Sequence, residues 1–595
     1  MNGFGRVARF SRRYVLRYWP WYLGGLVFLT LTNWLAVQIP LEMAKGIDAM
    51  RVSDPDGVSR AALLVGAMGV AVIAVRTLSR VLYFTPGRLA EFELRNDLFT
   101  RLLLLQPAFF TGQKTGDIVS RASSDIQYLR VMVGFGGLQI CNVSAALLLT
   151  GYRMFGLSPR LTLYCLGPVV VGMFVVQLGI SRFHTLMLRN QRQLGAISDH
   201  ILASLQGVRT IQGFNAGPAF TERLHERNQA FLRTNISMSW IAALIMPALG
   251  LAGSSCVYLL LAVGGPMAAT GELTVGELVA FVAYVGYLVM PLMSLGWMVS
   301  VFQRGAISLE RIDELLYAEP DRPEGPDPLP IPAGSPELTF KNLTFRYPEI
   351  KDGEEGRVDA LDGLDAHIPA GAVVGIYGRT GSGKSTLVRV LSRLYNPPPS
   401  TVFVGDTDLT RVNLDDWRRR IAVVPQVPFL FSDTIANNVS MGERDEARLQ
   451  DAVTNAALRP DLAALPDALE TVVGERGIML SGGQRQRTAL ARGLYRDFDL
   501  LILDDVLSAV DQKTEQQLID SLETIATSGR GAKGRPTTLI VSHRLSVMAR
   551  TDRVLVLDEG RLVDQGTHAE LLEREGLYRE AWLRQQSEAT EGVVA

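Results

Sequence analysis

The segment from Gly378 to Ser385 reads GRTGSGKS and has the residue types and spacing of a loop that binds phosphate groups. It matches the pattern G-x-x-x-x-G-K-[ST], follows the strand-like run 373–377 and precedes a helix-like run that starts at Thr386. Glycines let backbone N–H groups close around a β-phosphate, the lysine reaches the β and γ oxygens, and the hydroxyl binds Mg²⁺. The sequence therefore predicts ATP or GTP binding by Gly378, Arg379, Thr380, Gly381, Ser382, Gly383, Lys384, Ser385 and Thr386.

A pair of acidic residues, Asp504 and Asp505, ends a second strand-like run at 500–503. Carboxylate oxygens are ligands that Mg²⁺ prefers. In proteins with a phosphate loop of this kind, the first acid supports the metal ion that the loop hydroxyl also binds. We therefore expect Asp504 and Ser385 to hold one Mg²⁺ ion between them.

A third motif, LSGGQ at 480–484, stands directly before the helix-like run 485–495. The first N–H groups of a helix are unpaired and lie at the positive end of the helix dipole, so they attract anions. The segment is expected to contact a phosphate group.

Taken together, these motifs show that residues 337–580 resemble the nucleotide-binding domain of ATP-binding cassette (ABC) transporters. The resemblance implies that ATP is the nucleotide. It also implies a dimer in which each LSGGQ segment covers the γ-phosphate of the ATP that the opposite subunit holds. In this chain that contact falls to Ser481, Gly482, Gly483 and Gln484.

Four more positions take their roles from the same resemblance. Tyr347 is similar to the aromatic residue that stacks on adenine, and Gln426 to the glutamine that senses metal and water and couples to the membrane part. Asp511 belongs to a segment similar to the loop that crosses the dimer interface, and His543 is similar to the switch histidine. The implied catalytic residues are Asp505, His543 and Gln426, and the implied metal ligands are Ser385, Gln426 and Asp504.

One residue departs from the family pattern, because the position after Asp504 is normally glutamate and here is Asp505. The glutamate polarises the attacking water. A carboxylate that is one methylene shorter lies about 1.5 Å further away, and a misplacement of ~1 Å can cost on the order of a hundredfold in rate. This substitution resembles the degenerate site of two-gene transporters, so a heterodimer with a homologous half-transporter is favoured over a homodimer.

Composition places part of the chain in a lipid bilayer. Charged residues make up 20% of the 595 residues, against about 25% in typical soluble domains, and the mean hydropathy is positive at +0.17. The net charge of −1 argues against nucleic-acid binding. Apolar runs long enough to span ~30 Å recur at 19–44, 61–84, 132–155, 161–181, 239–264 and 276–299.

The links between these six predicted spans alternate in length and charge. Those at 85–131 and 182–238 are long, rich in arginine and helical in period, whereas the link at 265–275 has no lysine or arginine. The positive-inside tendency therefore places the long links in the cytoplasm, with the spans continuing outward as helices. The basic N-terminal segment, with five arginines in residues 1–17, is expected at the cytoplasmic membrane surface.

The N-terminal half also resembles the membrane domain of ABC exporters, on the spans, the long links and the segments TGDIVSR at 115–121 and LTVGEL at 273–278. We predict an all-α six-helix transmembrane domain over 1–316, a proline-rich linker over 317–336 and an α/β P-loop nucleotide-binding domain over 337–595. The resemblance implies a multi-pass protein of the cytoplasmic membrane, with its nucleotide-binding domain in the cytoplasm.

The function implied is ATP-driven export of an amphipathic drug, lipid or peptide-like substrate by one half of a dimer. Two alternatives remain open. One is an importer built on the exporter fold, and the other is a regulatory or gating subunit with little hydrolysis, which Asp505 favours.

Arg76 and Arg80 lie four residues apart near the inner end of the second predicted span, on one face of a helix. The commoner arrangement for such a pair is snorkelling to the membrane interface or a position already below the bilayer, and the alternative is a cavity that attracts anionic groups.

Overall fold

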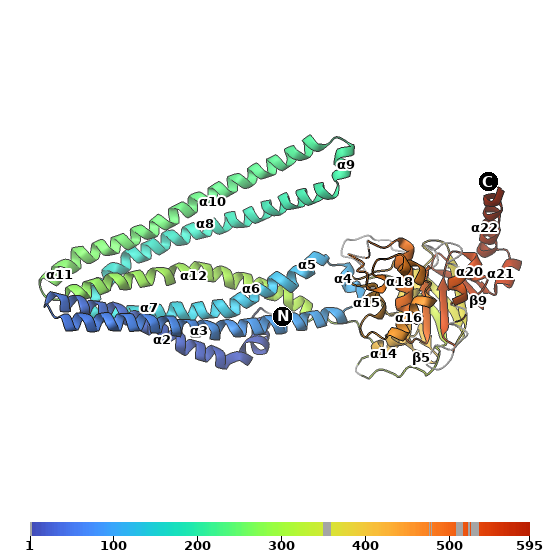
Figure 1. The fold of residues 1–595 in the computed structure, drawn as a ribbon, viewed down its shortest axis with the longest axis horizontal. Coiled ribbons are helices and arrows are strands. Elements are labelled where there is room, and N and C mark those ends of the chain that lie inside the picture. The colour runs from blue at the N-terminus through green and yellow to red at the C-terminus, as the bar shows by residue number, and fades with distance from the viewer. Residues whose placement is uncertain are drawn as a thin grey trace. The chain divides into compact units, whose positions relative to one another are not determined.

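The computed structural model describes residues 3–325, 327–348, 359–474, 477, 479–506, 516–521, 524 and 535–594. The chain forms two compact units. The first comprises Met1–Leu103 and Gly116–Ala318, and the second comprises Leu104–Thr115 and Glu319–Ala595. Figure 1 labels the elements of each.

The first unit is helical. Its helices are α1 (Gly3–Phe10), α2 (Trp19–Arg51), α3 (Pro55–Leu104), α5 (Thr115–Ser120), α6 (Ile126–Val131), α7 (Gly137–Leu157), α8 (Pro159–Gln206), α9 (Val208–Gly213), α10 (Gly217–Leu259), α11 (Gly265–Ala269) and α12 (Val275–Leu316). Short 3₁₀ or π turns join some of them, namely η1 (Ser11–Val15), η2 (Leu16–Tyr18), η3 (Arg121–Asp125), η4 (Met132–Gly136) and η5 (Leu260–Gly264).

The long helices extend well beyond a bilayer. Helix α3 has 50 residues and α8 has 48, so at 1.5 Å per residue each is roughly 70 Å long, more than twice the hydrocarbon thickness of ~30 Å. The predicted continuation of the spans as helices is confirmed, since the link at 85–131 is largely helical and the link at 182–238 is two helices joined through α9.

All six predicted spans fall on helix. Five helical stretches are apolar enough over their described residues to cross a membrane: Gly5–Arg51, Pro55–Leu104, Thr115–Leu157, Pro159–Gln206 and Gly250–Ala269. The sixth predicted span lies in α12, whose described apolar stretch is the shorter Val275–Leu288.

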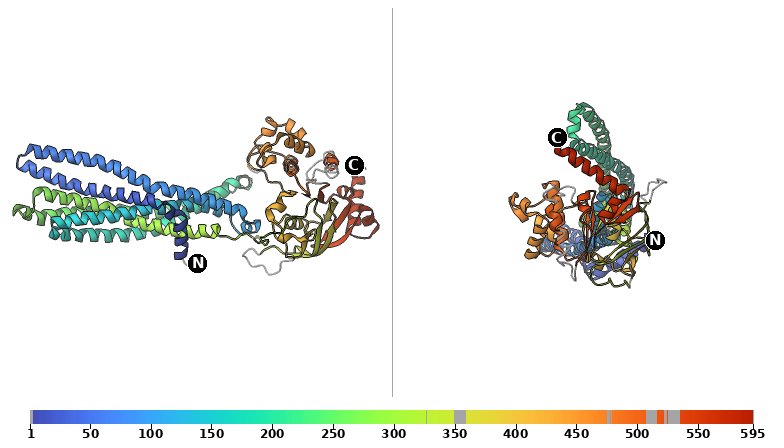
Figure 2. Two further views of the ribbon diagram at one scale, coloured as in Figure 1. Left: turned by 90° about the horizontal axis from the view of Figure 1, so that it is seen from below. Right: turned by 90° about the vertical axis from the view of Figure 1, so that its right-hand side faces the viewer.

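Helices α2, α7 and α12 pack together in the first unit, and α8 packs along α10. A buried cluster that includes Leu161 of α8, Cys256 of α10 and Phe281 of α12 joins the two groups, and the Tyr284 hydroxyl there donates to the Val37 carbonyl at 2.9 Å. Figures 1 and 2 show α8 and α10 side by side, and Figure 1 shows this pair separating from α12 toward α9. Five of the long helices contain an internal proline, at Pro40, Pro86, Pro168, Pro247 and Pro291.

An ionic network ties the predicted TGDIVSR segment to α12. Asp117 pairs with Arg121 at 2.8 Å and with Arg311. Arg311 also pairs with the buried carboxylate of Asp125 at 2.7 Å, and Ser308 donates to the same carboxylate at 2.8 Å. Because Asp125 is only 4% exposed, removing its partners would leave a costly unpaired charge.

The N-terminal arginines have protein partners that the sequence pattern did not indicate. Arg6 pairs with Glu310 of α12, and Arg13 and Arg17 pair with acidic residues of α3, at 2.7 and 3.2 Å. The segment η1 is anchored further by Tyr14, which is 1% exposed. Its basic charge is thus partly neutralised within the chain.

The second unit contains two sheets. Their strands are β1 (Leu338–Phe345), β2 (Leu361–Ile368), β3 (Val373–Gly378), β4 (Val402–Val404), β5 (Thr407–Asp408), β6 (Ile421–Val424), β7 (Leu500–Asp504), β8 (Thr537–Val541), β9 (Arg553–Asp558) and β10 (Arg561–Gly566). The smaller sheet has the order β2-β1-β4-β5 and is antiparallel. The larger has the order β10-β9-β3-β8-β7-β6, with parallel pairing from β9 to β6.

Helices and short turns of the second unit surround these sheets. They are α4 (Pro107–Thr111), α13 (Lys384–Leu391), η6 (Leu409–Arg411), α14 (Leu414–Arg419), α15 (Ile435–Ser440), α16 (Glu446–Asn455), α17 (Arg459–Ala463), η7 (Ala468–Glu470), α18 (Gly482–Tyr495), α20 (Leu545–Met548), α21 (His568–Glu573) and α22 (Leu577–Val594).

The six-stranded sheet separates two hydrophobic cores. Along β7, Leu501 and Leu503 face the core that contains α18, whereas Leu500 and Ile502 face the core that contains α13 and the smaller sheet. Strands buried on both faces are the expected environment for a parallel sheet. The α/β prediction for this part of the chain is therefore confirmed.

Between α12 and β1 the described residues 317–337 form no helix or regular strand, as the prolines predict. This linker is attached to the second unit by a buried ion pair. Arg393 is 0% exposed and donates to Glu324 at 2.6 Å and to the Val412 carbonyl at 2.7 Å. Arg322 also lies near Glu324, at 3.8 Å, but Arg393 is the closer of the two partners, and losing the close partner of a buried charge is costly.

We expect Arg393→Met to lower the stability of the second unit by about 3 kcal/mol, because the buried Glu324 would lose its close partner and keep only the more distant Arg322. The double variant Arg393→Met with Glu324→Leu should recover most of the loss. Thermal unfolding of the purified protein measures both. The control is Arg419→Met, which removes an exposed pair with Asp416 and should change little. An Arg393→Met variant as stable as the parent would contradict a stabilising role for the ion pair between Arg393 and Glu324.

Candidate nucleotide-binding site

Four neighbouring parallel strands deliver polar residues to one edge of the larger sheet. The phosphate loop follows β3, His543 follows β8, the acidic pair ends β7, and Gln426 follows β6. In parallel strands the carboxyl ends lie at the same edge, which is where ligands bind in open α/β sheets. The topology therefore assembles residues that are up to 165 positions apart in sequence, from Gly378 to His543.

The phosphate loop depends on glycine at specific positions. Gly381 and Gly383 have φ values of 87° and 94°, which other residues rarely adopt. At Gly378 there is no room for a side chain, since a Cβ would lie 2.3 Å from the Leu557 carbonyl oxygen. The loop then enters α13 at Lys384.

The Lys384 ammonium is turned toward its own loop. It donates to the carbonyls of Gly378 and Arg379 at 2.8 and 2.7 Å and lies 3.2 Å from the Ser382 hydroxyl. Burial lowers the pKa of Lys384, and the negative charges of Asp505 and Asp504 oppose that shift. The lysine is therefore held by its own loop, where phosphate oxygens can replace these carbonyls as its hydrogen-bond acceptors.

Ser385 and Asp504 lie together, as the metal hypothesis requires. The Ser385 hydroxyl donates to Asp504 at 3.3 Å. Burial raises the pKa of Asp504, while the hydrogen bond from Ser385 lowers it. A hydroxyl beside one carboxylate fits Mg²⁺, which takes one or two carboxylates and fills its other positions with water and phosphate oxygens. Among the described residues, no group of three or more His, Cys, Asp or Glu side chains is placed to hold a metal ion.

Asp505 joins two of the predicted catalytic residues. His543 Nδ1 lies 3.0 Å from one carboxylate oxygen, and Gln426 Nε2 donates to the other at 3.3 Å. The backbone of Asp505 has a φ of 50°, in the left-handed region that aspartate tolerates better than most residues. The structure thus brings Asp505, His543 and Gln426 together, through contacts that the sequence did not predict.

Tyr347 lies beside the start of α13. Its hydroxyl donates to Thr386 at 3.1 Å and accepts from Arg389 at the same distance. Its ring makes an edge contact with Tyr395, at 5.0 Å between centroids. Arg389 and Tyr395 were missed by sequence reasoning, because neither belongs to a motif and only the fold brings them to Tyr347.

The LSGGQ segment forms a capped and exposed helix start. The Ser481 hydroxyl accepts from the Gln484 N–H at 3.2 Å, and the Gln484 side chain accepts from the Ser481 N–H at 2.9 Å. This reciprocal capping box opens the 14-residue helix α18. Among the described residues no hydrogen bond joins the segment to the phosphate loop of the same chain. Asp511 lies outside the described residues.

The sequence matches the ABC transporter transmembrane region family over residues 22–292 and the ABC transporter family over residues 361–508. It is 33% identical over 581 residues to YheI of Bacillus subtilis, described as a probable multidrug resistance ABC transporter ATP-binding/permease protein, and the match covers 96% of each chain. The chain belongs to the ABC transporter family.

Other relatives of this ABC transporter match along nearly the whole chain. MdlA of Escherichia coli, a multidrug resistance-like ATP-binding protein, is 31% identical over 97% of this chain and 96% of its own. The ATP-dependent lipid A-core flippase of Chromohalobacter salexigens is 30% identical over 95% of each. A solved bacterial Atm1-family ABC exporter with ATP bound has a TM-score of 0.78 at 27% identity, covering 96% of this chain and 99% of that chain.

These findings establish the broad activity of the transporter. It is an exporter of the half-transporter type that binds ATP and couples ATP hydrolysis to transport. It is a multi-pass membrane protein with a cytoplasmic nucleotide-binding domain, and exporters of this type work as dimers.

We expect Lys384→Ala to weaken ATP binding at this chain's phosphate loop about tenfold, because it removes a charge-assisted contact to phosphate. The fold should persist, since the ammonium contacts only its own loop. Equilibrium binding of a labelled ATP analogue to the assembled dimer measures the loss, with the partner's phosphate loop disabled. The control is Lys341→Ala, whose ammonium lies over the Phe403 ring instead. Equal ATP retention by Lys384→Ala and the parent would count against the assignment.

Proposed function

We propose that this transporter is one subunit of a heterodimer that exports an amphipathic drug, lipid or peptide-like substrate. The substrate class is supported by the relatives, two of which carry multidrug resistance names and one of which is named as a lipid flippase. The partner is a homologous half-transporter, and residues 1–316, 317–336 and 337–595 are the transmembrane domain, the linker and the nucleotide-binding domain.

The main support for a heterodimer is the aspartate at position 505. The family has glutamate there, and a side chain one methylene shorter holds a water less closely to the γ-phosphate. Both of its oxygens are also engaged within the chain, by His543 at 3.0 Å and by Gln426 at 3.3 Å. This chain's phosphate loop therefore forms a slow ATP site.

The LSGGQ segment of this chain is intact, so it serves the second site of the dimer. Ser481, Gly482, Gly483 and Gln484 contact the γ-phosphate of the ATP that the partner holds. The exposure of Ser481 and Gly482, and the lack of a described hydrogen bond from the segment to the chain's own phosphate loop, support this division of roles. The partner then supplies the phosphate loop and the glutamate of the fast site.

Within the chain's own site each group has a separate task. Residues 378–386 hold the phosphates, with Lys384 on the β and γ oxygens, and Tyr347 stacks on adenine. Mg²⁺, held by Ser385, Asp504 and Gln426, would neutralise charge on those oxygens. Asp505 orients water, His543 supports the γ-phosphate end, and Asp511 contacts the partner across the interface.

ATP binding closes the two nucleotide-binding domains over both sites, and the spans then open outward. Hydrolysis and product release separate the domains and reset the transporter. Conformational steps of this kind often limit turnover. A gating subunit with little hydrolysis is the second candidate, because Asp505 is compatible with ATP binding that moves the spans without rapid turnover. An importer on the same fold is distinguished by the direction of substrate movement in inside-out vesicles.

Ser481→Arg should reduce transport more than Lys384→Ala does, because Ser481 acts on the partner's fast site. A bulky cation fills the space for the γ-phosphate and removes the cap of α18, which is worth ~1 kcal/mol of helix stability. ATP-driven substrate uptake into inside-out vesicles compares the two variants.

Thr567→Arg is the matched control for Ser481→Arg. Thr567 caps α21 through the same kind of capping box, with Glu570 in the place of Gln484. Thr567→Arg should reduce helix stability about as much as Ser481→Arg does, and it should leave transport unchanged. Comparable transport by Ser481→Arg and Lys384→Ala would remove the asymmetry on which the heterodimer rests.

Asp505→Glu should raise hydrolysis at this chain's own site by up to about a hundredfold, because it restores the reach of the carboxylate. The left-handed backbone at position 505 offsets part of the gain, since longer side chains fit it less well. Single-turnover ATP hydrolysis in the assembled pair measures the rate, with the partner's catalytic glutamate changed to glutamine.

Asp505→Asn serves as the control that removes the charge at nearly constant size, and it should show no gain. A parent pair that already hydrolyses ATP rapidly under these conditions would identify Asp505 as a working base. A symmetric homodimer with two equal sites would then replace the heterodimer.

A further inference from the structure

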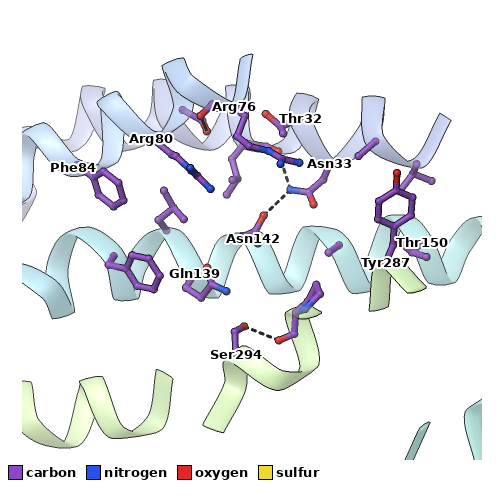
Figure 3. Close-up of a pocket in the computed structure, with 18 of the residues that line it drawn as sticks. Thr32, Asn33, Arg76, Arg80, Phe84, Gln139, Asn142, Thr150, Tyr287 and Ser294 are labelled. Carbon is purple, nitrogen blue, oxygen red and sulfur yellow. Dashed lines mark hydrogen bonds between the residues drawn. The ribbon is translucent and has the colours of Figure 1, made fainter. Parts of the chain in front are cut away.

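The first unit contains a cavity of about 740 Å³ among its membrane helices. The residues that line it come from α2, α3, η4, α7 and α12. A volume of this size lies within the ~300–1,000 Å³ of pockets that bind small molecules. Figure 3 shows its labelled side chains, with those of α2 and α3 facing those of α7.

Arg76 and Arg80 both line this cavity. Figure 3 shows the two side chains on the side of α3 that faces α7, so neither is directed away from the cavity. Snorkelling to the membrane interface, the commoner arrangement for such residues, is therefore not what this geometry shows. The pair faces the cavity instead.

The charge of the cavity is unbalanced. Its lining includes two guanidinium groups and no aspartate or glutamate. Across the described ranges, no ion pair joins either arginine to a carboxylate. Like charges four residues apart on a helix repel each other, and an arginine within a membrane segment is costly and usually marks a functional site. An anion between the two guanidinium groups would relieve both costs.

The remaining lining supplies a polar region beside an apolar one. Asn33 Nδ2 donates to Asn142 Oδ1 at 3.1 Å, which fixes an amide pair between α2 and α7 close to the arginines. Gln139, Thr32 and Tyr287 add further polar groups to the lining. The apolar surface comes from Leu29, Ala36, Val37, Phe84, Phe135, Leu138 and Ala146.

We propose that Arg76 and Arg80 bind the anionic head group of an amphiphile, a phosphate or a group of similar charge and shape, while its apolar body lies against the aromatic and aliphatic wall. The proposal deepens the proposed export function by giving the charge of the substrate. Planar guanidinium forks match the oxygens of phosphate and carboxylate groups in pairs, which lysine does not do equally well.

Binding of labelled dodecyl phosphate to the assembled dimer in nanodiscs of neutral lipid tests this site. The double variant Arg76→Gln with Arg80→Gln should bind at least about tenfold more weakly, as expected for the loss of charge-assisted hydrogen bonds. Arg76→Lys with Arg80→Lys should retain part of the affinity. Dodecyl maltoside, which has the same chain and no charge, should bind the parent and the double glutamine variant equally.

Arg60→Gln is the matched control, because Arg60 is an exposed arginine on the same helix α3 that does not line the cavity. It should bind dodecyl phosphate as the parent does. Inorganic phosphate distinguishes a head-group site from a site for the free anion, and it should compete only weakly. Competition by inorganic phosphate at the affinity of dodecyl phosphate would overturn the amphiphile assignment.

Unchanged binding of dodecyl phosphate by the double glutamine variant would overturn the arginine site altogether. The export function is tested separately, by ATP-dependent movement of dodecyl phosphate in inside-out vesicles. Loss of binding in the double variant, combined with no ATP-dependent movement in the parent, would retain the anion site and reject anionic amphiphiles as the exported substrate.

Discussion

The parallel pairing of β3, β8, β7 and β6 is the constraint on which the nucleotide site depends. Each strand is held in register by backbone hydrogen bonds and is buried between two cores, so its carboxyl end has little freedom. The phosphate loop, His543, the acidic pair and Gln426 follow those ends. The sheet therefore sets the distances between these segments. A few side-chain hydrogen bonds, such as those of Asp505 with His543 and Gln426, complete the site.

Sequence reasoning about this site is most direct where a motif carries its own geometry. The phosphate loop requires glycine at positions that can be read directly, and φ values of 87° and 94° at Gly381 and Gly383 agree with that need. Gln426 and His543 could be assigned only through family resemblance, because single polar residues after apolar strands carry no local signal. The left-handed backbone of Asp505 and its contacts to both residues depend on tertiary packing and could not be predicted.

In the fold, too, local features could be predicted from sequence and contacts between distant segments could not. Long apolar runs and helical period predicted the helices of the first unit and their continuation beyond the membrane. Pairings between distant segments were not predictable, as in Arg13 with Asp97 or Arg393 with Glu324, because they depend on which helix faces meet. The two environments considered for Arg76 also looked alike in sequence, since a helix face contains no information about its neighbour.

The internal prolines of α2, α3, α8, α10 and α12 give these helices a mechanical property. A proline has no N–H, so each position lacks one backbone hydrogen bond and the helix can bend there without breaking another. At Pro291 the carbonyl left without its usual donor is that of Tyr287, and both residues line the cavity. Bending of α12 at that point would change the shape and hydration of the cavity wall together. The same peptide groups of α12, near Tyr287 and Pro291, therefore affect both how easily the helix bends and how much water the cavity wall holds.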